Sequence, residues 1–130
     1  MKKRPRPGKI ILNGIKLEPH ELATLTFLSN LGEDIEIIPP TLTPHTKNAD
    51  LIMNGLTWEM KSPLINSKRA IERIFYRSTQ QANNIIFDLR RIKNSETDII
   101  DQLTKLFQAT RKARNLLIIT KNEKLLVRKK

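Results

Sequence analysis

The sequence lacks three features, and each absence excludes a class of protein. It has no cysteine among its 130 residues, which excludes disulfide bridges, thiolate zinc sites and a thiol nucleophile. It has no apolar run near the roughly 20 residues that a membrane-spanning helix needs, so we expect no membrane association. Its basic N-terminus carries no apolar stretch of the kind found in secretory signals, so no signal peptide is visible. A chain of this length fits one domain with its own hydrophobic core.

Acidic residues are also scarce, and they are unevenly placed. The formal net charge is +11, which favours a polyanionic partner because neutralising phosphates releases their condensed counterions. From charge alone, a soluble basic protein without such a partner is the alternative. Residues 1–16 contain six bases and no acid, residues 61–130 contain 17 bases and six acids, and residues 17–60 contain seven acids and only one base. This acidic segment would repel nucleic acid unless something such as a metal ion neutralises it.

Periodicity and turn signals predict a single α/β domain. Residues 1–8 are polar and interrupted by proline, which is typical of a disordered basic arm, and the domain then occupies residues 9–130. Helices that alternate with apolar strands imply a mixed central β-sheet with helices on both of its faces. We expect strands at 10–12, 35–38, 51–53, 56–60, 85–89, 116–120 and 125–127, and helices at 19–31, 68–82 and 95–112.

The strongest local signal is Asn54-Gly55 between two short apolar runs, which is typical of a two-residue β-hairpin loop. A loop of that length fixes the register so that Asp50 lies opposite Glu59, with Lys61 two residues further along on the same face. Directly opposed side chains have Cβ atoms about 4.5–5.5 Å apart. Two carboxylates at that spacing repel each other unless they share a divalent cation.

Asp50, Glu59 and Lys61 are residue types that metal-assisted phosphodiester hydrolysis needs. Mg²⁺ or Mn²⁺ suits the two carboxylates, because these ions prefer oxygen ligands and keep several waters. Zn²⁺ is less suited, since neither histidine has a ligand spacing. The cation would polarise a phosphoryl oxygen and activate a water, and the Lys61 ammonium would orient that water or offset charge on the phosphorus oxygens. The alternative is that all three side chains face solvent, with Glu59 paired to Lys61.

Glu21 is a further candidate, on the helix expected at 19–31. It falls on the apolar stripe of that helix, where a carboxylate is costly unless it has a partner. This position makes it a candidate third metal ligand beside Asp50 and Glu59. Its alternative role is that of a helix-start acid that complements the helix dipole.

Basic residues recur on the helix expected at 68–82. Arg69, Arg73 and Arg77 follow each other at a spacing of four residues, with Gln81 next in the same row. Such a row predicts a substrate-binding stripe that contacts phosphates. The alternative is an ordinary solvated helix face.

The sequence also resembles a known superfamily and, within it, a known family. Asp50, the turn at 54–55 and the run Trp58-Glu59-Met60-Lys61-Ser62-Pro63 are together similar to the core motif of the PD-(D/E)XK nuclease superfamily. More narrowly, residues 20–130 resemble the C-terminal tRNase domains of contact-dependent growth-inhibition toxins, most of all at 58–63, 81–91 and 116–120. The resemblance covers most of the chain. One departure is that Ala49, and not proline, precedes Asp50.

The resemblance implies a restriction-endonuclease-like core in the order αβββαβ and a metal-dependent ribonuclease toxin that acts on tRNA. The catalytic residues that it implies are Glu21, Asp50, Glu59 and Lys61, with Gln81 as a supporting group. It also implies an acidic immunity protein as partner, and action in the cytoplasm of a target bacterial cell after delivery. The chain would be either an excised toxin domain or a stand-alone protein. A DNA endonuclease of the same superfamily and a non-catalytic basic module that binds nucleic acid are the alternatives.

Overall fold

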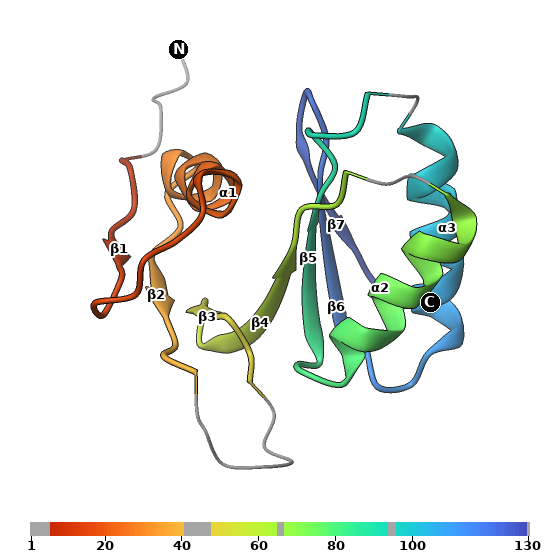
Figure 1. Ribbon diagram of the computed structural model, residues 1–130, viewed down its shortest axis with the longest axis horizontal. Helices are drawn as coiled ribbons and strands as arrows, with labels where there is room; N and C mark the ends of the chain where they lie inside the picture. The colour runs from red at the N-terminus through yellow and green to blue at the C-terminus, as the bar shows by residue number, and fades with distance from the viewer. Residues whose placement is uncertain (1–5, 41–47, 65–66, 94–95, 130) are drawn as a thin grey trace.

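The computed structural model describes residues 6–40, 48–64, 67–93 and 96–129, and it has the expected α/β architecture (Figure 1). Each of the predicted helices and strands is present, in the predicted order. None of the described helices is long and apolar enough to cross a lipid bilayer. Along the chain the elements are β1 (Ile10–Ile11), α1 (Pro19–Asn30), β2 (Ile35–Ile37), β3 (Leu51–Met53), β4 (Leu56–Lys61), α2 (Lys68–Thr79), β5 (Asn84–Asp88), α3 (Thr97–Ala109), β6 (Asn115–Ile119) and β7 (Lys124–Val127).

The strands form one mixed sheet whose spatial order follows the chain, from β1 to β7. β1 pairs parallel with β2, and the β3–β4 hairpin continues the sheet antiparallel to β2. β4, β5 and β6 run parallel, and β7 is antiparallel to β6. Parallel neighbours need crossover connections. α1 lies in the connection from β1 to β2, α2 in that from β4 to β5, and α3 in that from β5 to β6.

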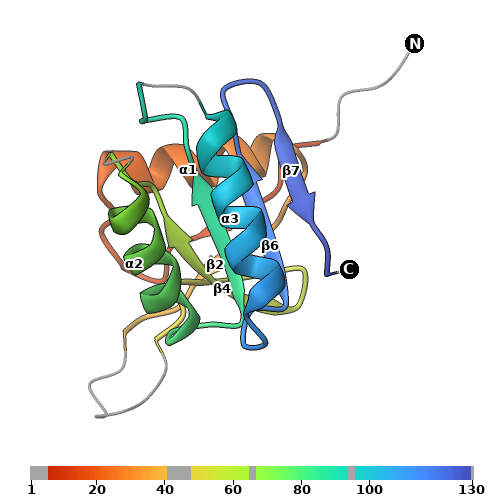
Figure 2. The ribbon, with the colours of Figure 1, turned by 90° about the vertical axis from the view of Figure 1, so that its right-hand side faces the viewer.

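Different helices cover the two faces of the sheet, as the alternation of helices and strands predicts. α1 packs on one face, over a core cluster that includes Trp58 and Met60. α2 and α3 lie side by side on the other face (Figure 2), over a cluster that includes Phe87. Because side chains alternate along a strand, β4 directs Glu59 and Lys61 to the face that α2 covers.

The β3–β4 hairpin has the predicted register, in which Met53 lies opposite Leu56. Asn54 has a φ of 54° and Gly55 a φ of 72°. Two successive positive φ values are what a type I′ turn requires, and asparagine and glycine tolerate them best. The Trp58 indole also donates a hydrogen bond to the Met53 carbonyl at 3.0 Å. These local features align the residues of β4 with those that precede β3.

Two helices end about three residues before their predicted ends. α2 begins after its predicted cap, where the Ser67 hydroxyl accepts a hydrogen bond from the Ala70 N–H at 3.2 Å, but it stops at Thr79 and not at residue 82. α3 stops at Ala109 and not at residue 112. The Lys129 ammonium donates to the Phe107 carbonyl at this end, and cations at helix C-termini are favourable.

The N-terminal boundary of the folded domain lies before residue 9. Residues 1–5 are outside the described part of the chain, so the predicted arm is not tested there. Gly8, however, donates its N–H to the Ser29 carbonyl at 2.8 Å, and its own carbonyl accepts from the Ser29 hydroxyl at 2.7 Å. A Cβ at this position would lie 1.8 Å from the Glu33 carbonyl oxygen. Gly8 therefore belongs to the folded domain.

Candidate active site

Asp50 and Glu59 come together at the base of the hairpin. Asp50 directly precedes β3, where its N–H donates to the Trp58 carbonyl at 2.9 Å and its Oδ2 accepts from the Met60 N–H at 2.8 Å. Main chain and side chain thus both fix Asp50 against β4. The ladder of paired strand residues stops at Leu51, one residue short of the predicted pair. The carboxyl groups of Asp50 and Glu59 nevertheless lie close enough to interact.

Glu59 is a buried carboxyl group with one unpartnered oxygen. The residue is only 5% exposed. Its Oε2 lies 3.1 Å from Lys61 Nζ, whereas its Oε1 is buried without a hydrogen-bond partner. The pKa of Glu59 is raised to about 7, and burial is the largest cause. The charge of Asp50 and the hydrogen bond that a protonated Glu59 can share with Asp50 raise it further, and Lys61 only partly offsets the rise. Buried polar atoms without a partner are rare, which marks this group as a candidate for binding a ligand.

The donor set at Asp50 and Glu59 fits a divalent cation. Ions such as Mg²⁺ are commonly held by one or two carboxylates together with waters. A cation here would pair with the buried Oε1 of Glu59 and relieve the repulsion that helps to raise its pKa. Within the four described segments, no group of three or more His, Asp or Glu side chains is arranged to hold a metal ion. The structure therefore brings two of the predicted metal ligands together and not the third.

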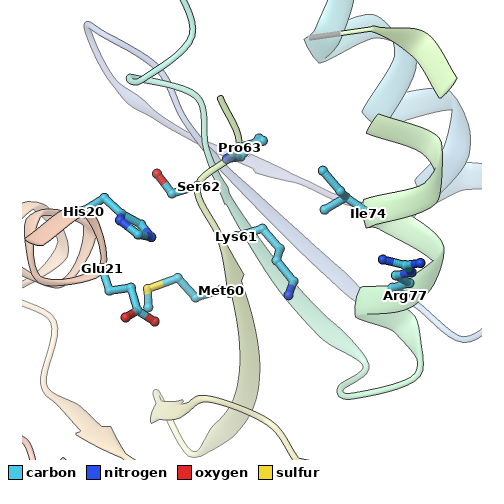
Figure 3. A pocket seen from close by; sticks show the side chains of 8 residues that line it. All are labelled: His20, Glu21, Met60, Lys61, Ser62, Pro63, Ile74 and Arg77. Atoms are coloured by element: carbon cyan, nitrogen blue, oxygen red, sulfur yellow. The ribbon is translucent and has the colours of Figure 1, made fainter. Parts of the chain in front are cut away.

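Glu21, the third predicted ligand, caps the first turn of α1. Its Oε1 accepts a hydrogen bond from the Glu18 N–H at 2.9 Å. Figure 3 shows its carboxylate beside Met60 on the α1 side of β4, whereas Lys61 extends towards α2. In this structure Glu21 thus has the helix-start role that was its alternative, and among the described residues it forms no three-carboxylate metal site with Asp50 and Glu59.

A cleft of about 330 Å³ opens between α1, the end of β4 and α2. Its lining consists of His20 and Glu21 from α1, residues 60–63, and Ile74 and Arg77 from α2 (Figure 3). Lys61 belongs both to this cleft and to the ion pair with Glu59, so the cleft directly adjoins the carboxyl groups. The sequence did not single out His20 for this place.

The predicted basic stripe is exposed on α2. Arg69, Arg73 and Arg77 all reach solvent, and none of them forms an ion pair with another described residue. Of the three, Arg77 lines the cleft. The guanidinium groups are therefore free to contact phosphates, and Arg77 is the one nearest to the candidate chemistry.

Gln81, predicted at the end of the same row, has a structural contact instead. Its Oε1 accepts a hydrogen bond from the Asn48 N–H at 2.9 Å. Asn48 lies two residues before Asp50, so Gln81 holds the segment that carries this carboxylate. The contact makes Gln81 a positioning residue for the candidate site.

A second buried carboxylate, which the sequence did not single out, lies at the end of β5. Asp88 accepts hydrogen bonds from the Thr24 hydroxyl at 2.7 Å and from Arg90 Nε and Nη2 at 3.0 and 2.8 Å. Burial opposes its ionisation, but the hydrogen bonds from Arg90 and Thr24 outweigh burial and lower its pKa. The cluster ties α1 to the sheet. The sequence pattern that could have revealed this pair is an acid at the end of a predicted buried strand with an arginine two residues later.

Residues 47–125 match the family model described as the contact-dependent growth inhibition CdiA C-terminal domain. The match spans more than half of the chain and includes Asp50, Glu59, Lys61 and Gln81. The chain belongs to this family. Membership in the CdiA C-terminal domain family points to a toxic effector of the nuclease type.

The fold of this CdiA C-terminal domain is also similar to a solved structure, a CdiA-CT/CdiI toxin and immunity complex from Burkholderia pseudomallei. The TM-score is 0.72 at 21% sequence identity, and the likeness covers 93% of this chain and 99% of that chain. At this identity the likeness carries the fold alone. No curated protein matches the chain.

Proposed function

We propose that this CdiA C-terminal domain is a metal-dependent ribonuclease toxin of the PD-(D/E)XK type that hydrolyses phosphodiester bonds in tRNA. The observation that carries the proposal is the arrangement of Asp50, Glu59 and Lys61. Two carboxyl groups interact, one of them is buried with an unpartnered oxygen, and an ammonium lies 3.1 Å from its other oxygen. The choice of tRNA rests on the sequence resemblance.

Each of these residues has a distinct role in the proposal. Asp50 and Glu59 would hold Mg²⁺ or Mn²⁺, and Glu21 is a further ligand only if its carboxylate leaves the Glu18 N–H. Such a cation, when bound, activates a water and polarises a phosphoryl oxygen. Lys61 would contact the phosphate oxygens and stabilise the negative charge that develops on them. Gln81 would keep Asp50 in place through the hydrogen bond to Asn48.

The exposed bases on α2 supply the attraction for nucleic acid. Arg69, Arg73 and Arg77 lie in one row that leads to the cleft. Contacts from such residues to phosphates raise affinity without reading sequence. The net charge of +11 adds long-range attraction for a polyanion.

An immunity protein is the proposed protein partner. The similar solved structure is a toxin and immunity complex, and we extend that partnership to this chain. The partner would be acidic, because an acidic surface complements the exposed bases of α2. The toxin would act in the cytoplasm of a target bacterial cell after delivery.

The test is to incubate the purified chain with tRNA and, in parallel, with duplex DNA, in Mg²⁺ or Mn²⁺ with and without EDTA. We expect cleavage of tRNA by wild type, and we expect EDTA to abolish it. Asp50→Ala, Glu59→Ala and Lys61→Ala should each abolish cleavage as well, while the circular dichroism spectrum stays native. Undiminished cleavage in all three variants would reject the assignment of the site. Cleavage of DNA alone would favour a DNA endonuclease, and salt-sensitive binding without products would favour a non-catalytic module.

A further inference from the structure

The cleft beside Lys61 has two chemically different walls. On the α2 side, Lys61 and Arg77 present positive charge, whereas on the α1 side His20 and Glu21 present a ring and a carboxylate (Figure 3). A phosphate is attracted to the first wall, and the Glu21 carboxylate repels it from the second. The cleft therefore favours a ligand with an anionic end and an uncharged end.

Apolar atoms also line the cleft and suit a flat, partly apolar group. Met60 and Pro63 contribute them between the two walls, and Ile74 contributes them from α2. The His20 side chain has no hydrogen bond within the part of the chain that the structure describes, so its ring is free to stack. Ser62 also lines the cleft, and its hydroxyl is buried without a hydrogen-bond partner. Such atoms are rare in folded proteins, and neither the fold nor the proposed chemistry at Asp50 and Glu59 explains this one.

Contacts outside the cleft hold its walls in place. Arg90 donates to the Ala23 carbonyl at 3.0 Å and lies 4.7 Å from the centre of the Phe27 ring, which fixes α1. Arg91 donates to the Ser62 carbonyl at 2.9 Å, which fixes the end of β4. The cleft is thus largely formed before any ligand arrives, as small-molecule sites usually are.

We infer that this cleft is a subsite for one unpaired nucleotide next to the scissile phosphate. The inference rests on the proposed nuclease function and deepens it. The phosphate lies against Lys61 and Arg77, and the base enters between His20 and Ile74. A volume of about 330 Å³ is at the lower end of the roughly 300–1,000 Å³ of ligand sites, which suits one nucleotide and not a duplex.

The inference specifies the substrate class. A base inside a duplex reaches such a cleft only if it is unstacked and flipped out, which costs free energy, whereas a base in a loop or at an end is already available. The enzyme should therefore cut RNA in unpaired segments and spare stems. A DNA endonuclease that reads an intact duplex would have no use for this cleft.

The first measurement is binding in EDTA, where no metal-dependent cleavage interferes. The probe is a fluorescein-labelled single-stranded RNA octamer with 2-aminopurine at one position, read by anisotropy and by 2-aminopurine emission. Ile74→Trp, which fills the cleft, should weaken binding about tenfold and abolish the emission change that wild type gives. Ile100→Trp is the matched control, because both isoleucines are partly buried against the same core cluster and Ile100 does not line the cleft. The control should bind within twofold of wild type.

His20→Ala provides a second variant that leaves the core untouched. Removing an aromatic ring that stacks on a base weakens binding of single-stranded nucleic acid, and we expect a loss of about fivefold or more. If Ile74→Trp and His20→Ala both bind the octamer like wild type, or if wild type gives no 2-aminopurine change, the nucleotide subsite is rejected.

Cleavage by wild type separates this inference from the proposed function. With Mn²⁺, we expect hydrolysis of bis-p-nitrophenyl phosphate and of the single-stranded octamer, and at least tenfold slower cutting of the octamer when its complement is annealed. If wild type binds the octamer as expected but hydrolyses neither substrate, the nuclease function is overturned and the nucleotide subsite stands. Hydrolysis of octamer and annealed duplex at equal rates would overturn the subsite and leave the nuclease standing.

Discussion

Two neighbouring parallel strands carry the same pattern, a buried acid that pairs with a base two residues later, but the surroundings of the two acids differ. On β5, Asp88 faces α1, and Thr24 and Arg90 satisfy its carboxylate. Its pKa is lowered despite its burial. On β4, Glu59 faces α2 beside a second carboxyl group, keeps one oxygen without a partner, and has its pKa raised to about 7.

The comparison separates a structural ion pair from a candidate ligand site. Asp88 has used its hydrogen-bonding capacity within its own chain, so its contribution is to hold α1 on the sheet. Glu59 is left by folding in an environment that disfavours its charged form, and an added cation would relieve this cost. The same short sequence pattern thus gives opposite outcomes because the two strands direct it to different faces.

The largest expected effect is on catalysis. Glu59→Gln should lower the rate of tRNA cleavage by on the order of 10³-fold, because the amide removes a charge on which the reaction depends. Asp88→Asn is the matched change in the other pair. The rate of tRNA cleavage by the folded fraction of that variant should stay within tenfold of the wild-type rate. Single-turnover cleavage assays check both. An equal loss in the two variants would remove the distinction between the pairs.

The next effect is on stability, in the opposite direction. Asp88→Ala should lower the free energy of unfolding by about 3 kcal/mol, because it leaves Arg90 partly buried without its partner. Glu59→Gln should change that free energy by less than about 1 kcal/mol at pH 5, where Glu59 is itself protonated. Urea denaturation at constant ionic strength measures both. If Glu59→Gln is the more destabilising of the two, Glu59 is a structural residue.

The pH dependence of stability should also distinguish Glu59. Its pKa rises from 4.5 to about 7 on folding, so the folded chain holds this proton more tightly than the unfolded chain. The stabilisation that protonated Glu59 contributes is therefore fully present below pH 4.5 and is lost as the pH rises through 7. In metal-free buffer, the free energy of unfolding of Glu59→Gln, measured relative to wild type, should therefore rise by about 2–3 kcal/mol between pH 4.5 and pH 8. A difference between the two that is constant with pH would contradict the raised pKa.

The smallest effect expected is at Gln81, which positions Asp50 and does not touch the carboxylates itself. Gln81→Ala should raise the Mn²⁺ concentration for half-maximal activity about tenfold, the lower end of what supporting residues contribute. Gln80→Ala is the matched control, because Gln80 is the adjacent residue and its side chain is exposed. An unchanged requirement in Gln81→Ala would show that the hydrogen bond to Asn48 has no role in the site.

The contrast between local and distant contacts also explains what the sequence could predict. The turn at Asn54-Gly55 fixed the hairpin register, and alternation along β4 then placed Glu59 and Lys61 on one face. The helices and strands followed from periodicity, but the ends of α2 and α3 did not, because last-turn contacts with the rest of the chain decide them.

Contacts between distant parts of the chain were beyond prediction. Thr24 and Asp88 are separated by 64 residues, and Asn48 and Gln81 by 33. Periodicity gives the face of an element but not its neighbour, so Gln81 was predicted to bind substrate and Asp88 was not predicted at all. Glu21 lay on the apolar stripe as predicted, yet its carboxylate turned to the end of its own helix.

Calorimetric titration of Mn²⁺ into the metal-free chain at pH 8 tests most directly whether Asp50 and Glu59 share a divalent cation. We predict one Mn²⁺ bound by wild type, binding lost in both Asp50→Asn and Glu59→Gln, and binding retained in Asp88→Asn. Mn²⁺ that binds equally well to all four proteins, or to none of them, would contradict the account.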